Sequence, residues 1–253
     1  KTPDSSLTEV RRGSARGLFF NHSETNPLMQ ADFAQKLRYV LSTERLAAYQ
    51  QQLTGNGNLN LFSHYAWNMA MSESLYSTLQ LLEIGLRNTL HQAAVAHFGK
   101  ANWFDDNALI HPREQAAVYK AKQVLRSKKK PLEPGRIIAE LNFGFWTSLL
   151  DKRYEQMLWP ALIKASFPHM PKTSRTRKNL SKRFNKIRHL RNRVFHHEPI
   201  WYWQDLAQQH DAILDALAWI EPAMQDLAGA IDRFPEVYQQ GLQEIQGKIK
   251  RFC

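Results

Sequence analysis

The stretch that decides the fold is Tyr65–Asn88, which reads YAWNMAMSESLYSTLQLLEIGLRN. From Leu75 onward, and two residues past the end of this stretch, leucines recur at steps of four, three, four and four residues: Leu75, Leu79, Leu82, Leu86 and Leu90. This spacing is that of one apolar face of an α-helix. Because no proline lies between Leu28 and His111, the pattern predicts one long helix over residues 61–98, which Gly99 would end.

Helical spacing recurs on both sides of this stretch, and no segment alternates as a strand does. Residues 31–53 are predicted to form a helix, and breaks rich in Gly, Ser and Pro separate those that follow: 113–126, 137–150, 155–167, 174 to 196 or 197, 205–227, and one that begins at Pro235. The sequence therefore predicts an all-α bundle of seven or eight helices. It would form a single domain over residues 31–253, after a polar N-terminal arm, residues 1–30.

Composition excludes several classes of protein. With 43% apolar residues among 253, the chain is not disordered as a whole. One cysteine, Cys253, excludes an internal disulfide framework and a thiolate-rich metal site. No apolar run approaches the length of a membrane span, and residues 1–30 lack the apolar core of a signal peptide. We therefore expect a cytoplasmic protein that does not bind a membrane.

The net charge of +11 is concentrated in one part of the chain. Lys120–Arg193 contains 20 basic and 4 acidic residues, and Lys164–Arg193 contains 11 basic residues and no acid. Such a block is either a solvated helix face or a surface that binds polyanions, whose phosphates supply the counter-charge. On the second interpretation the residues that contact RNA or DNA are Lys172, Arg175, Arg177, Lys178, Lys182, Arg183, Lys186, Arg188 and Arg193.

Arg191 stands out within the helix predicted from Ser174. On a helical projection it falls in the middle of an apolar face, among Leu180, Phe184, Ile187, Val194 and Phe195. An arginine that points at a core or an interface is costly unless it is paired. Arg191 is therefore either one half of a structural ion pair or a functional group.

The residues after Arg191 favour a functional role. The chain continues RNRVFHHEPI, so that Arg191, Asn192, His196 and His197 lie within seven residues, and Pro199 ends the helix near His197. On a straight helix, positions 191 and 196 point about 140° apart, too far to share one small site. Either the last turn is distorted, or the arginine bends across, or two chains pool their residues in a dimer. We favour pooling, with some distortion.

At these residues the sequence resembles the Abi-like proteins (abortive infection, AbiD/AbiF type) of the HEPN superfamily. Their signature is an arginine, often followed by asparagine, and then a histidine after four to six residues; Arg191-Asn192-x-x-x-His196 fits it. Three further stretches are similar to that group: Tyr65–Asn88, GKANWF at Gly99–Phe104 and ELNFGFWTSLL at Glu140–Leu150.

The resemblance implies a dimeric HEPN-like helical bundle with additional helices and a metal-independent ribonuclease activity, as used by toxins and by phage-defence systems. It implies that Arg191 and His196 form the catalytic pair and that Asn192 orients the substrate, with His197 as a second candidate histidine. No cofactor and no metal would be needed. A histidine would take the proton of an RNA 2′-hydroxyl, and arginine would stabilise charge on the phosphoryl oxygens.

Two further groups of residues allow more than one interpretation. Glu83 and Arg87 have the spacing of an ion pair on one helix; they either form a structural pair or position Arg191 or bind phosphate, with Asn88 as a third member. The aromatic run Trp201-Tyr202-Trp203 is more typical of a core or a dimer interface than of a platform for bases.

Three functions remain open at this stage. The first is an RNA endonuclease that acts as a homodimer. The second is a non-catalytic module that binds RNA or DNA through the basic face over residues 164–193. The third is a toxin that an inhibitory, antitoxin-like partner protein holds inactive. The first is favoured, because a binding surface alone does not require histidines behind a core-facing arginine.

Overall fold

The structure is a computed structural model that describes residues 27–55 and 57–252. The prediction of an all-α fold is confirmed, with no strand among these residues. Besides two short 3-10 helices, η1 (Trp103–Asp105) and η2 (Lys152–Tyr154), the described chain forms eleven α-helices: α1 (Pro27–Leu41), α2 (Thr43–Gln50), α3 (Asn58–Phe98), α4 (Pro112–Ser127), α5 (Pro134–Glu140), α6 (Phe143–Ser148), α7 (Trp159–Ser166), α8 (Arg177–Phe195), α9 (Leu206–Ile220), α10 (Pro222–Ile231) and α11 (Phe234–Ile249).

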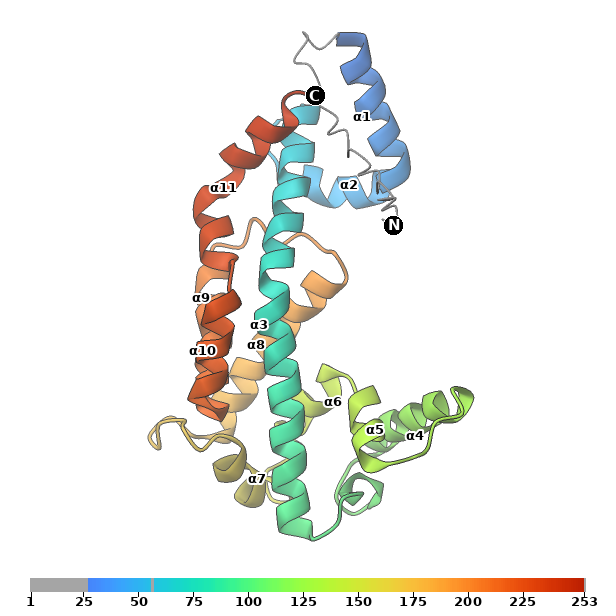
Figure 1. Cartoon of the computed structure of the whole chain (residues 1–253), viewed down its shortest axis with the longest axis vertical. Helices are drawn as coiled ribbons and strands as arrows, with labels where there is room; N and C mark the ends of the chain where they lie inside the picture. Colours follow the sequence, from blue (N-terminus) through green and yellow to red (C-terminus); the bar gives the residue numbers. More distant parts are fainter. Residues whose placement is uncertain (1–26, 56, 253) are drawn as a thin grey trace, which may run out of the picture.

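The long helix α3 is the axis of the molecule (Figure 1). It runs for 41 residues and ends at Gly99, whose φ of 67° is the left-handed conformation that glycine adopts without strain. Its leucine face is buried, as the spacing predicted. Helices α7, α9 and α11 pack along it, whereas α4 and α5 pack against each other and project to one side.

The apolar residues form two clusters. The larger joins the leucine face of α3 to aromatic residues such as Trp103, Trp146 and Phe184, each fully buried. The smaller lies where α1 and α2 meet the start of α3, around Leu46 and Tyr49. Trp201 packs against both clusters and so links the α1–α2 end of the molecule to the main core.

The helix count is higher than the predicted seven or eight because three predicted helices are each broken into two. At Ser42, Asn142 and Glu221 a side-chain oxygen accepts a backbone N–H of the following turn, and so caps a new helix. The predicted end of the N-terminal arm is also wrong, since residues 27–30 already belong to α1. The rest of that arm, residues 1–26, lies outside the described residues.

Candidate functional site

The end of α8 is where the candidate catalytic residues lie. The helix ends at Phe195, and the chain then turns through His197, whose φ of 58° is left-handed. The amide of Glu198 donates to the carbonyl of Arg193 at 2.8 Å, and that of His197 donates to the carbonyl of Val194 at 3.1 Å. These two bonds make a Schellman motif, which satisfies the last carbonyls of the helix.

Two side chains from other helices hold this turn in place. Arg45 of α2 donates to the carbonyl oxygen of His197 at 2.6 Å. Asn68 of α3 is 3% exposed, and its side-chain oxygen accepts the amide of Ile200 at 2.7 Å and that of Trp201 at 3.3 Å. The turn after α8 is therefore fixed to the molecule on two sides.

A cavity of about 350 Å³ brings three of the four candidate residues together. Arg191, Asn192 and His196 line it from α8 and its cap, with Arg188 one turn earlier. Other elements contribute the remaining lining residues: Arg113, Glu114, Ala117, Asn142, Gly144 and Phe145. The cavity thus holds three guanidinium groups, two amides and one imidazole. Such a set of groups is suited to bind a phosphate.

A dimer is therefore not needed to bring Arg191 and His196 into one cavity. His196 lies beyond the end of α8 with φ −95° and ψ 8°, so the 140° separation on an ideal helix does not apply to it. Within one chain, Arg191 and His196 line the same cavity.

Arg191 is oriented by α3. Its Nε and Nη2 donate to the same carboxylate oxygen of Glu83, at 3.2 and 3.1 Å. Its guanidinium carbon lies 4.0 Å from the centre of the Phe195 ring, which stacks in turn on Tyr76 at 5.0 Å. Tyr76 and Glu83 are seven residues apart, two turns along one face of α3. Glu83 of α3 thus holds the edge of the guanidinium group, and Phe195, which stacks on Tyr76 of α3, covers its planar surface.

The predicted pairing of Glu83 with Arg87 is not present. Glu83 pairs with Arg191 instead, and Arg87 donates to the side chain of its neighbour Asn88 at 3.1 Å. The interpretation in which Glu83 positions Arg191 agrees with this geometry, whereas Arg87 and Asn88 contact each other and do not line the arginine cavity.

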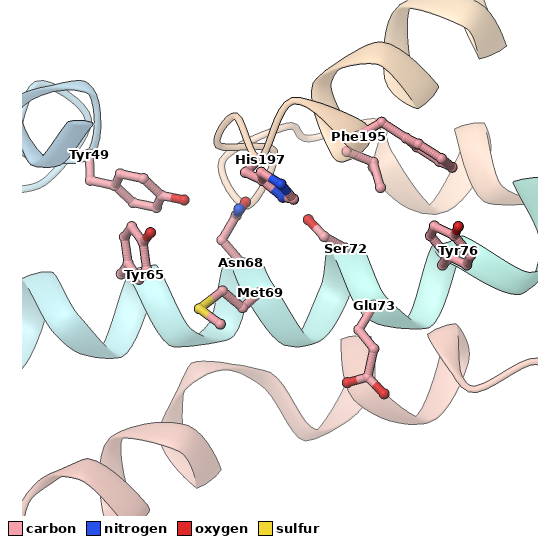
Figure 2. A pocket seen from close by; sticks show the side chains of 10 residues that line it. Tyr49, Tyr65, Asn68, Met69, Ser72, Glu73, Tyr76, Phe195 and His197 are labelled. Atoms are coloured by element: carbon pink, nitrogen blue, oxygen red, sulfur yellow. The ribbon is translucent and has the colours of Figure 1, made fainter. Parts of the chain in front are cut away.

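His197 lies in a different place from His196. It lines an apolar groove of about 290 Å³ between the end of α8, α2 and the first half of α3. Figure 2 shows its ring among Phe195, Ser72 and Asn68, with Tyr76 at one end of the groove and Tyr49 and Tyr65 at the other. Adjacent histidines therefore line separate hollows of the surface.

We compared the chain with family models, with curated proteins and with solved structures. None of the three comparisons gives a match.

Among the residues described, no helix is long and apolar enough to cross a membrane. The same part of the chain contains no group of three or more His, Cys, Asp or Glu side chains arranged to hold a metal ion.

Much of the predicted basic face is neutralised within the molecule. Four of its cations form ion pairs with acids of other segments: Arg177 with Glu155, Arg183 with Asp215, Lys186 with Asp205, and Arg193 with Glu198. The hydrogen bond from Lys186 holds the pKa of Asp205 below its usual value. Acids from other parts of the sequence thus supply the counter-charge for which phosphates were expected.

The other predicted RNA contacts fall into two groups. Arg175 donates to the carbonyls of Pro168 and Met170, and Arg188 donates to the side chain of Asn185, so both also brace the fold. Lys172, Lys178 and Lys182 are exposed and make no ion pair with a described residue. These three retain their whole charge for a ligand.

Of the cavity residues that were not predicted from the sequence, Arg113 and Asn142 carry polar groups suited to bind a ligand. Arg113 lies in the first turn of α4, and Asn142 caps α6 by accepting the amide of Phe145 at 3.0 Å. Neither belongs to a motif with a chemical meaning, and both lie far from position 191 in the chain. Asn142 does fall in the Glu140–Leu150 stretch that carries the family resemblance, which is the one signal that could have drawn attention to it.

Glu114, beneath the cavity, fixes the base of α4. It is 2% exposed and accepts hydrogen bonds from Ser148, Arg153 and the hydroxyl of Tyr154, at 2.6–2.9 Å. Burial, and the bond to Glu114, raise the pKa of Tyr154. The charge of Glu114 is balanced by its ion pair with Arg153, at 2.7 Å.

The aromatic run after the motif belongs to the core. Trp201 and Trp203 are partly buried and pack against the main cluster, and Trp203 stacks on His189 at 5.4 Å. The core interpretation of this run agrees with the structure.

Proposed function

We propose that this protein is a metal-independent RNA endonuclease in which Arg191 and His196 act on one phosphodiester. The observation that carries the proposal is the arginine cavity, where Arg191, Asn192 and His196 meet two further arginines. The resemblance of Arg191-Asn192-x-x-x-His196 to the HEPN signature supports it independently. An arginine that needs only a structural partner does not require a histidine and an amide in the same cavity.

The reaction follows from the groups present. Neutral His196 takes the proton of a ribose 2′-hydroxyl, whose oxygen forms a bond with the adjacent phosphorus while the bond to the 5′-oxygen breaks. Arg191 stabilises the charge that develops on the phosphoryl oxygens, and Asn192 orients the phosphate. The products are a 2′,3′-cyclic phosphate and a 5′-hydroxyl. DNA lacks the nucleophile and would not be cut.

The leaving 5′-oxygen needs a proton, and this supports a homodimer. The arginine cavity contains one histidine per chain, because His197 lines the other groove. A second copy of the chain would supply a protonated His196 as the acid.

The biological role is carried by the resemblance alone. It would be that of a toxin or an abortive-infection protein, which cleaves RNA in its own cell during phage infection. A protein with that role needs restraint, and an inhibitory partner would provide it. Co-purification of the chain with a second, non-identical protein that blocks cleavage would support this role.

Purified protein and single-stranded RNA in the presence of EDTA test the activity. Cleavage is expected to persist in EDTA, to leave cyclic phosphate ends, and to vanish in Arg191→Ala and in His196→Ala. An RNA with a single 2′-deoxyribose at the cut site should resist at that site. Undiminished cleavage by either variant would overturn the catalytic assignment.

The alternative, a non-catalytic module that binds RNA or DNA through residues 164–193, receives less support. Four of its predicted contacts are already paired with acids in the folded chain. Salt-dependent binding without any cleavage, unchanged in Arg191→Ala, would favour it over the nuclease.

A further inference from the structure

Helix α4 and the turn that follows it carry positive charge that nothing in the described chain compensates. Five exposed cations in residues 112–130 make no ion pair and no side-chain hydrogen bond with any described residue: Arg113, Lys120, Arg126, Lys129 and Lys130. The one acid of the segment, Glu114, is buried and bonded to other groups. Two further cations of the segment, Lys122 and Lys128, pair with Asp105 and Glu140, so the uncompensated charge is that of the five cations named above.

The charged surface begins in the arginine cavity. Arg113 and Ala117 line the cavity, and Lys120 and Val124 continue the same face of α4 at helical spacing. At 1.5 Å per residue, Lys120 lies about 10 Å from Arg113 along the axis, and the end of α4 at Ser127, where the turn begins, about 21 Å. Because α4 projects from the side of α3 (Figure 1), this face leads outward from the cavity.

An exposed aromatic residue accompanies these cations. Tyr119 is 64% exposed and shares the outer face of α4 with Arg126, seven residues on, about 100° round the axis from Lys120. An exposed aromatic ring beside cations suits single-stranded nucleic acid, whose bases stack on the ring while the cations contact the phosphates. A membrane surface would instead require an apolar anchor. Along α4, Tyr119 is the one large hydrophobic side chain that is strongly exposed.

We propose that α4 and the turn at residues 128–130 form a track for single-stranded RNA, which holds the strand on one side of the scissile phosphate. Charge complementarity and continuity with the arginine cavity identify the occupant. The direction of the track, toward the cut site, rests on the proposed function. Its affinity for RNA rests on the unpaired cations.

A matched pair of triple variants tests the track by binding. One replaces Lys120, Lys129 and Lys130 with alanine; the control replaces Lys152, Lys164 and Lys250, which are also exposed, lack ion-pair partners among described residues and are not among the predicted RNA contacts. Both are made in the His196→Ala background, so that RNA is not cut. The slope of log affinity against log salt should become shallower by about 2 in the track variant, because each phosphate of a single strand that a lysine neutralises adds about 0.7 to the slope. The control should keep the wild-type slope.

Equal slopes in the two variants, or a larger decrease in the control, would overturn the track. So would a chain that binds no RNA, or one that binds vesicles containing phosphatidylserine through these lysines. Tyr119→Leu should weaken RNA binding while it leaves the salt slope unchanged, because stacking releases no counterions. An unchanged affinity for this variant would remove the aromatic residue from the track.

Cleavage separates the two proposals. With His196 restored, the track variant should cut a dinucleotide as well as the wild type does, because a dinucleotide does not reach Lys120. Its kcat/KM on a long single strand should fall about tenfold or more. Absence of cleavage of any RNA by the wild type would refute the nuclease, while the salt slopes would still decide whether the track exists.

Discussion

Adjacent residues at the end of α8 have different surroundings, so that only one of the two candidate histidines lines the same cavity as Arg191. His196 lines the arginine cavity, and His197 lines the aromatic groove on the other side of the turn. The sequence presented both as candidates, since the helical spacing gave no reason to prefer either. The left-handed backbone of His197 separates the two side chains. Nothing in the sequence indicated this conformation, because asparagine or glycine is more usual at such a position.

The two histidines should therefore respond differently to the same substitution. His196→Asn removes the proton acceptor and should lower kcat/KM by about 10² to 10⁴-fold. His197→Asn should leave kcat/KM nearly unchanged, because asparagine tolerates the left-handed conformation that this position needs. Steady-state cleavage of one RNA by both variants gives the comparison. A decrease in His197→Asn as large as in His196→Asn would show that the groove takes part in the chemistry.

Glu83 should act by positioning Arg191. In Glu83→Ala the guanidinium group loses its acceptor and can turn away from the cavity, so kcat should fall about tenfold or more while KM changes little. In Glu83→Gln one amide oxygen can still accept from Arg191, and most of kcat should return. Measured kcat and KM for both variants, with thermal unfolding as a check, test this. Equal kcat in the alanine variant and the wild type would leave Glu83 a purely structural role.

At the scale of elements, hydrophobic spacing predicted where helices lie better than where they end. The leucine face of α3 and the stop at Gly99 followed from local sequence, because the signals act within a few residues. The breaks at Ser42, Asn142 and Glu221 were missed, since each of these residues also occurs inside helices. The capping role of each residue is seen only from the hydrogen bond that its side chain makes in the folded chain.

The contact between α3 and η1 should make stability depend on pH. The indole N–H of Trp103 donates to Nδ1 of His91 at 3.1 Å, and burial lowers the pKa of His91. The unfolded chain therefore takes up this proton at a higher pH than the folded chain. Stability from this group is complete above about pH 6.5 and is lost as the pH falls below it.

The variant His91→Asn tests this dependence. Its side-chain oxygen can replace Nδ1 as the acceptor, and it does not titrate in this range. The free energy of unfolding, measured by denaturant above and below about pH 6.5, should fall less on acidification than in the wild type. His97→Asn, at an exposed position of the same helix, is the matched control and should behave as the wild type. The same fall in all three proteins would contradict the assignment.

At the scale of the whole molecule, the site could be predicted only in part. The motif on α8 was visible in the sequence, but Arg113 and Asn142 reach the cavity from α4 and α6 through tertiary packing. The neutralisation of the basic face by acidic side chains could not be predicted from the sequence either. Asp205 and Asp215 lie beyond the basic segment in the chain, and the packing of α9 on α8 brings them to it.

Trp201 should couple the two ends of the molecule. It packs against both apolar clusters, and its amide donates to the side-chain oxygen of Asn68 at 3.3 Å. Trp201→Ala should lower the free energy of unfolding by about 3 kcal/mol and separate the unfolding of the α1–α2 end from that of the main core. Denaturation followed by circular dichroism and by tryptophan fluorescence would then give two midpoints. Coincident transitions in this variant, as expected for Trp201→Phe, would refute the coupling.

The left-handed turn at His197 has a consequence for how functional analogues of this chain could be recognised. A count of residues between arginine and histidine treats spacings of four and five as equivalent. The backbone does not: one residue more would move the histidine from the last right-handed position to the left-handed one, and so from the arginine cavity to the aromatic groove. A search template that asks for histidine immediately before the left-handed residue would therefore discriminate better than any allowed range of spacings.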